Sequence, residues 1–152
     1  NMTGSLRFSG KIEGVKVSIG KDKLSVICGG FMSTKKILII DDEEDILEML
    51  KQGLELRSSY DVSIASERDE YEKLLGEETY DVIFLDHRMP VIKGANLATD
   101  IRNYDGPNQN TIIVFISGNI KEVKVLAESL PLCYFLQKPL ILQELYDLLD
   151  SI

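Results

Sequence analysis

The sequence has few of the residues that build disulfide frameworks, zinc sites or membrane spans. Its 152 residues include two cysteines, one histidine (His87) and no tryptophan. Two cysteines are too few for a disulfide framework and indicate a reducing compartment, and one histidine excludes a His/Cys metal cluster. No apolar run approaches the roughly 18 residues of a membrane span, and residues 1–10 lack the apolar stretch of a signal peptide. We therefore expect a cytoplasmic protein with no membrane partner.

Positive charge is also scarce. Lys and Arg number 17 against 25 Asp and Glu, which gives a net charge of −8. Binding to nucleic-acid phosphates requires clustered cations, so we expect no direct contact of this segment with nucleic acid. Hydrophobic residues make up 44% of the chain, which suffices for the core of one domain of this length.

The charge and the composition both change near residue 34. Residues 1–35 contain six Lys or Arg and two Asp or Glu, a net charge of +4, so the remainder carries −12. The same stretch is rich in Gly and Ser, which indicates a boundary between a leader at 1–33 and a folded domain at 34–152. Met32 followed by Ser-Thr-Lys-Lys is typical of a translation start. Residues 1–31 are therefore native, derived from a vector, or the result of a misassigned upstream start.

The leader has the alternating apolar and polar residues that are typical of two β-strands. Apolar and polar residues alternate over 15–19 and over 24–26, with turn-forming residues 20–23 between them. This pattern predicts a β-hairpin over about residues 14–28, with a third short strand at 6–12. Because so small a sheet is marginal alone and has open edges, we expect it to pack on another chain and to form a homodimer or higher assembly. A tail ordered only by lattice contacts is the alternative.

From residue 36 onward, short apolar runs alternate with helical patterns. The apolar runs predict five strands, at residues 36–40, 62–66, 82–85, 112–116 and 134–137. Apolar residues at helical spacing predict helices near residues 43–54, 71–75, 94–101, 123–130 and 140–149. This alternation predicts an α/β fold, a doubly wound five-stranded parallel sheet with helices on both faces.

Charged and hydroxyl side chains follow four of the five strands. Asp41 and Asp42 follow the first strand, Asp86 the third, Ser117 the fourth and Lys138 the fifth. The carboxyl ends of parallel strands share one edge of the sheet, where such folds bind ligands. Three carboxylates repel one another unless a cation lies among them, and oxygen ligands suit Mg²⁺. Since an aspartate can attack phosphorus, this set favours phosphoryl transfer, although each residue alone is also typical of a turn or helix cap.

Four motifs at these strand ends resemble those of the receiver domains of two-component response regulators, over residues 36–152. The motifs are the acidic pair in 37–43, the Asp…Met-Pro…Gly loop in 86–94, Ser-Gly at 117–118 and the aromatic with Lys-Pro in 135–140. The resemblance implies a flavodoxin-like receiver fold. It also implies that the domain catalyses only its own phosphorylation and dephosphorylation and is not otherwise an enzyme.

The resemblance implies a role for each charged residue. Asp86 would accept a phosphoryl group from a sensor histidine kinase or a phosphotransfer protein. Mg²⁺ would be held by Asp42, Asp86 and the backbone carbonyl of Arg88, with Asp41 acting through a bound water. Lys138 would pair with the acceptor carboxylate and with a phosphoryl oxygen.

The resemblance also implies a switch. Ser117 would move toward the phosphoryl group, which lets Phe135 turn inward and reshapes the output face around the last helix. Arg88 and Asn119 lie two residues past the acceptor and the switch hydroxyl, so they would border the path of the attacking water and tune the lifetime of the phosphoryl group. We expect Arg88 to slow hydrolysis.

Two other classes of function stay open. An aspartyl-nucleophile phosphatase-like hydrolase is the first, but such enzymes usually carry a second Asp where this chain has Arg88. The second is a binding module, either an unphosphorylated protein-interaction domain or an FMN carrier. The chain also departs from the receiver pattern before the last strand, where residues 129–133 replace the usual Gly-Ala turn.

Overall fold

A computed structural model of the chain describes residues 16–19, 24–27 and 34–152. The chain divides into two compact units, Asn1–Ser33 and Thr34–Ile152, and each is described by itself. None of the helices in the described part of the chain has the length and apolar character that crossing a membrane requires.

In the first unit, two short strands pair antiparallel. They are β1 (Lys16–Ile19) and β2 (Leu24–Ile27), with Val17 opposite Val26. This is the pairing that the alternation of apolar and polar residues predicts. The third strand expected at residues 6–12 lies outside the described residues. The expected packing of this unit on another chain stays a prediction.

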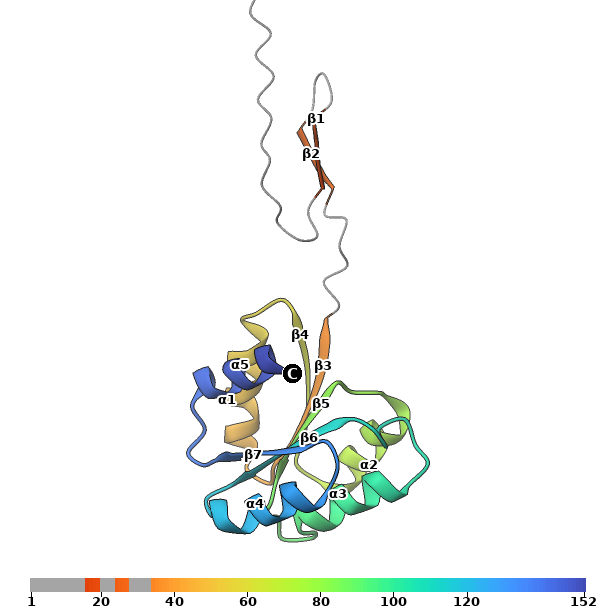
Figure 1. The fold of residues 1–152 in the computed structure, drawn as a ribbon, viewed down its shortest axis with the longest axis vertical. Helices are drawn as coiled ribbons and strands as arrows, with labels where there is room; N and C mark the ends of the chain where they lie inside the picture. Colours follow the sequence, from red (N-terminus) through yellow and green to blue (C-terminus); the bar gives the residue numbers. More distant parts are fainter. Residues whose placement is uncertain (1–15, 20–23, 28–33) are drawn as a thin grey trace, which may run out of the picture. The chain divides into compact units, whose positions relative to one another are not determined.

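The second unit is built on one parallel sheet with the strand order β4-β3-β5-β6-β7. Its strands are β3 (Lys35–Ile40), β4 (Tyr60–Ala65), β5 (Val82–Asp86), β6 (Ile112–Ser117) and β7 (Cys133–Gln137). Its helices are α1 (Glu44–Glu55), α2 (Arg68–Glu77), α3 (Gly94–Asn103), α4 (Ile120–Ser129) and α5 (Leu142–Ser151). All four strand pairings are parallel. The predicted doubly wound α/β fold is confirmed (Figure 1).

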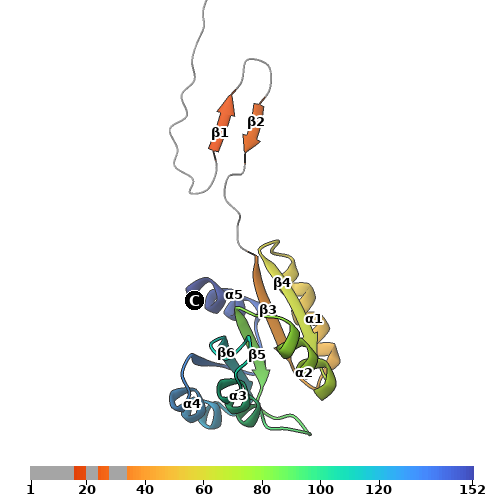
Figure 2. The ribbon, with the colours of Figure 1, turned by 90° about the vertical axis from the view of Figure 1, so that its right-hand side faces the viewer.

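Helices cover both faces of this sheet. One buried cluster contains residues of α1 and α5, and the other contains residues of α2, α3 and α4 (Figures 1 and 2). In β3, Ile37 and Ile39 face the first cluster while Leu38 and Ile40 face the second. Burial on both faces is the physical reason that the strand reads as a continuous apolar run.

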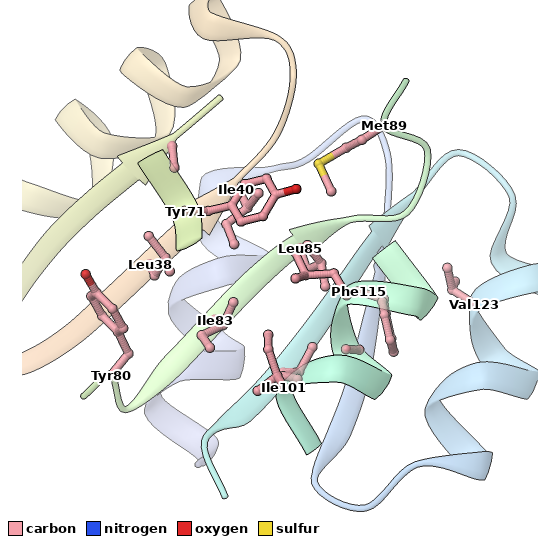
Figure 3. Packing of buried hydrophobic residues seen from close by; sticks show 14 of the residues in the cluster. Leu38, Ile40, Tyr71, Tyr80, Ile83, Leu85, Met89, Ile101, Phe115 and Val123 are labelled. Carbon is pink, nitrogen blue, oxygen red and sulfur yellow. The ribbon is translucent and has the colours of Figure 1, made fainter. Parts of the chain in front are cut away.

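On the three-helix face, large side chains from neighbouring strands meet the helices. Figure 3 shows Leu38, Ile83 and Phe115 from three strands of the sheet, together with Tyr71 of α2 and Val123 of α4 in the same buried cluster. Each of these side chains is at most 3% exposed. Close packing of these buried side chains fixes the strand ends, which are followed by the charged and hydroxyl side chains of the candidate site.

Most element boundaries differ slightly from the sequence prediction, and two of the differences have a direct structural reason. Strand β4 begins at Tyr60 rather than Val62, because Tyr60 pairs with Lys35 and its side chain is buried. Helix α5 begins at Leu142 rather than Leu140, because the carbonyl of Ile141 accepts the first helical hydrogen bonds. Leu140 packs against the same cluster as α5, so apolar spacing alone does not separate it from the helix.

Candidate functional site

The three acidic residues expected at the carboxyl edge of the sheet lie together. Strands β3 and β5 are neighbours, and Asp41, Asp42 and Asp86 each offer a carboxylate oxygen within 4.8 Å of the others. Asp41 and Asp86 are buried, at 0% and 3% exposure, whereas Asp42 is exposed. The cluster therefore has a buried side and a side open to solvent.

Lys138 joins two of these carboxylates. It follows β7, and its backbone N–H donates to the carbonyl of Ser117 over 2.9 Å, which holds it beside β6. Its Nζ donates to Asp41 Oδ2 over 3.0 Å and lies 3.3 Å from Asp86 Oδ1. Glu43 Oε1 is 3.7 Å from the same Nζ, a contact that the sequence reasoning missed.

The acidic cluster contains more negative charge than Lys138 balances. Burial raises the pKa of the Asp86 carboxyl and the charge of Asp41 raises it further, while Lys138 opposes both effects. Burial lowers the pKa of Lys138, but its hydrogen bond to Asp41 and the charges of Asp41 and Asp86 outweigh this, so the pKa is raised. A divalent cation would relieve the repulsion, and a donor set made only of oxygen suits Mg²⁺.

The loop after Asp86 is closed tightly on itself. Arg88 and Lys93 form an antiparallel bridge, and the N–H of Gly94 donates to the carbonyl of His87 over 3.0 Å. A Cβ at Gly94 would lie 2.5 Å from the carbonyl oxygen of Asp86, so only glycine fits there. The loop thus fixes the backbone that directly follows the Asp86 side chain.

Ser117 and Asn119 occupy the turn between β6 and α4. Ser117 is buried, and its Oγ accepts the N–H of Asn119 over 3.1 Å. Asn119 is the N-cap of α4, and its side-chain oxygen accepts the N–H of Lys121 over 3.2 Å. This capping role was not predicted from the sequence. Phe135 is half-buried on β7 opposite Phe115 and packs against the three-helix cluster.

The side chain of Arg88 is directed toward α4. Its Nη2 lies 3.0 and 3.2 Å from the two carboxylate oxygens of Glu122. His87 Nε2 is 3.6 Å from Glu122 as well. No sequence signal pointed to Glu122, because its partners lie 34 and 35 residues away, on a loop.

The comparison with known families decides what kind of domain carries this site. The response regulator receiver domain family matches residues 37–150, which include all five parallel strands from Ile37 onward. The chain belongs to this family. Receiver domains bind Mg²⁺ in an acidic pocket, and Asp41, Asp42 and Asp86 form such a pocket in this receiver domain.

Curated relatives of the receiver domain are longer proteins. The transcriptional regulatory protein PrrA of Mycobacterium leprae is 32% identical over 114 residues, which are 75% of this chain and 48% of PrrA. The chain thus spans about half the length of the curated relatives it matches.

Solved structures share the fold of this receiver domain. The chemotaxis protein CheY4 of Vibrio cholerae is 25% identical with a TM-score of 0.69, covering 78% of this chain and 98% of CheY4. A response regulator from Burkholderia pseudomallei, solved with a phosphorylated aspartic acid, a calcium ion and citrate, is 26% identical with a TM-score of 0.62. That match covers 74% of this chain and 64% of the other. The expected family is confirmed, whereas the roles of individual residues stay predictions.

Proposed function

We propose that this receiver domain works in the cytoplasm and accepts a phosphoryl group on Asp86 from a sensor histidine kinase or a phosphotransfer protein. The observation that carries the proposal is the position of Lys138 Nζ, at 3.0 Å from Asp41 and 3.3 Å from Asp86 inside the acidic cluster. The phosphorylated aspartic acid and the calcium ion in the Burkholderia pseudomallei structure support it.

In the proposed step, a carboxylate oxygen of Asp86 attacks the phosphorus of a phosphohistidine. The new O–P bond forms as the P–N bond breaks, and the electron pair of that bond passes to the imidazole nitrogen, which takes a proton. The charge of Lys138 opposes the rise in the pKa of Asp86 and so favours the ionised, nucleophilic carboxylate. Its ammonium group also stabilises negative charge on the phosphoryl oxygens.

The site fits a bound Mg²⁺. Asp42, Asp86 and the backbone carbonyl of Arg88 would hold the ion, and Asp41 would act through a bound water. When bound, Mg²⁺ neutralises charge on the phosphoryl group during transfer. The same acids repel one another without it, so we expect the ion to stabilise the fold as well as the reaction.

The switch is proposed to start at Ser117. Its hydroxyl would donate to the phosphoryl group, and rotation of the side chain toward that group would move its Oγ away from the N–H of Asn119. Because Asn119 caps α4, the movement would change both α4 and the neighbouring β7, where Phe135 turns inward. The phosphoryl group thereby shifts the population between two arrangements of the output face.

A phosphatase-like hydrolase is less well supported. The position where such an enzyme would carry its second acid holds Arg88, whose guanidinium pairs with Glu122. An unphosphorylated interaction module is also less well supported, because it would not require three mutually repelling carboxylates at one site.

The test is incubation with acetyl phosphate, with and without Mg²⁺, followed by intact-mass measurement. Wild type is expected to gain one phosphoryl group only with Mg²⁺, and Asp86→Asn to gain none. Asp61→Asn, which removes an exposed carboxylate on β4, is the control and should behave as wild type. A phosphoryl group on Asp86→Asn would contradict the proposal.

A further inference from the structure

Glu122 of α4 contacts both residues that follow the proposed acceptor. Its carboxylate oxygens are 3.0 and 3.2 Å from Arg88 Nη2, and Oε2 is 3.6 Å from His87 Nε2. His87 and Arg88 directly follow Asp86 in the chain. The Glu122 side chain of α4 therefore contacts the loop directly beside the proposed site of phosphoryl transfer.

The contact of Glu122 with Arg88 is easier to break than its contact with His87. His87 is 7% exposed and its ring packs edge-on to that of Phe115, so the ring is held in place. The Arg88 side chain is 66% exposed and that of Glu122 is 42% exposed, and ion pairs at such exposure are weak. An anion near Asp86 can therefore draw Arg88 away from Glu122 at small cost.

There is room for Arg88 to move. An open groove of about 750 Å³ lies between the loop and α4. Arg88 and Glu122 both line it, together with Lys93 and Val125. Because the Arg88 side chain is largely exposed, it can leave the groove through solvent and turn toward Asp86 without displacing the core.

We propose that Glu122 is a positioning residue that competes with the phosphoryl group on Asp86 for the guanidinium of Arg88. The inference rests on the proposed phosphorylation of Asp86. A phosphoryl group carries about two negative charges and three acceptor oxygens, and the planar guanidinium binds such groups with paired hydrogen bonds. Before phosphorylation Arg88 pairs with Glu122, and afterwards it pairs with the phosphoryl group.

The exchange has two consequences. Transfer of Arg88 removes one of the two contacts between Glu122 and the loop, on the helix whose N-cap adjoins Ser117. The transferred guanidinium also covers the acyl phosphate and slows the attack of water. Loss of the Glu122 carboxylate leaves Arg88 available to the phosphoryl group and should lengthen the lifetime of the aspartyl phosphate.

The experiment measures the half-life of the phosphorylated protein after acetyl phosphate is removed in Mg²⁺ buffer. Glu122→Gln is expected to lengthen the half-life about two- to fivefold, the range for loss of an exposed ion pair. Arg88→Ala is expected to shorten it, and Glu122→Gln added to Arg88→Ala should cause no further change. Glu128→Gln, an equal charge change at an exposed residue of α4, should leave the half-life unchanged.

The dependence of the Glu122 effect on Arg88 separates positioning from a merely structural role. The proposal is overturned if Glu122→Gln keeps the wild-type half-life, or if it changes the half-life equally with and without Arg88. In either case a phosphorylated wild type leaves the proposed function intact. If wild type gains no phosphoryl group, the proposed function fails, and the role of Glu122 fails with it.

Discussion

Asp42→Ala is expected to abolish stabilisation of the receiver domain by Mg²⁺. Asp42 is the exposed member of the cluster in which three carboxylate oxygens lie within 4.8 Å of one another. Without Asp42, the ion would lose one of its proposed direct ligands. The remaining pair, Asp41 and Asp86, is already partly balanced by Lys138.

The size of the effect follows from binding linkage. If the site binds Mg²⁺ with a Kd of about 1 mM, about 10 mM Mg²⁺ raises the free energy of unfolding by about 1.4 kcal/mol. For a domain of about 120 residues, this corresponds to a rise of about 6 °C in the melting temperature. Tighter binding gives a larger rise.

The assay is thermal unfolding followed by circular dichroism, with and without Mg²⁺ at that concentration. Wild type should show the rise, and Asp42→Ala should show none. Asp45→Ala removes an exposed acid from the first turn of α1 and is the matched control, with a rise equal to that of wild type. An undiminished rise in Asp42→Ala would show that this acid is only a cap or a turn residue.

Three further predictions concern the acceptor, a turn and the leader. Burial and the charge of Asp41 raise the pKa of Asp86 in the folded state above its unfolded value of about 4. The free energy of unfolding should therefore fall as the pH rises from about 4 through the folded-state pKa. Asp86→Asn should therefore melt above wild type at pH 7 without Mg²⁺, with a difference that disappears in acid; a lower melting temperature at pH 7 would refute this. Leu132 has a positive φ of 55°, so Leu132→Gly should raise the free energy of unfolding by about 0.5–1 kcal/mol in urea titrations. The same change at Leu56, an exposed residue with φ −60°, should lower it, and equal effects would contradict the argument. The leader is expected to pack on another chain, so deletion of residues 1–31 should lower the oligomeric state measured by light scattering; an unchanged oligomeric state and melting temperature would contradict this.

The sheet and the acidic cluster could be predicted because their signals are local. Burial on both faces makes β3 and β5 continuous apolar runs, and a parallel sheet brings the residues after its strands to one edge. That is why Asp41, Asp86 and Lys138 could be grouped from the sequence alone.

Contacts between distant side chains could not be predicted in this way. Arg88 was expected beside the acceptor, yet its partner Glu122 lies on a helix 34 residues further along the chain. Asn108 is another example, since its buried amide bonds the backbone of Leu75, Tyr80 and Glu78 across the fold. Neither pairing leaves a periodic or spacing signal, because it depends on how packed elements meet in three dimensions.

The position of the phosphoryl group itself decides whether Asp86 is the acceptor. Borohydride reduces an aspartyl phosphate to homoserine, so the modified position can be read by peptide mass spectrometry after treatment with acetyl phosphate and Mg²⁺. We predict homoserine at position 86 and at no other aspartate. Homoserine at position 41 or 42, or its absence from a protein that has gained a phosphoryl group, would contradict the assignment of Asp86 as the acceptor.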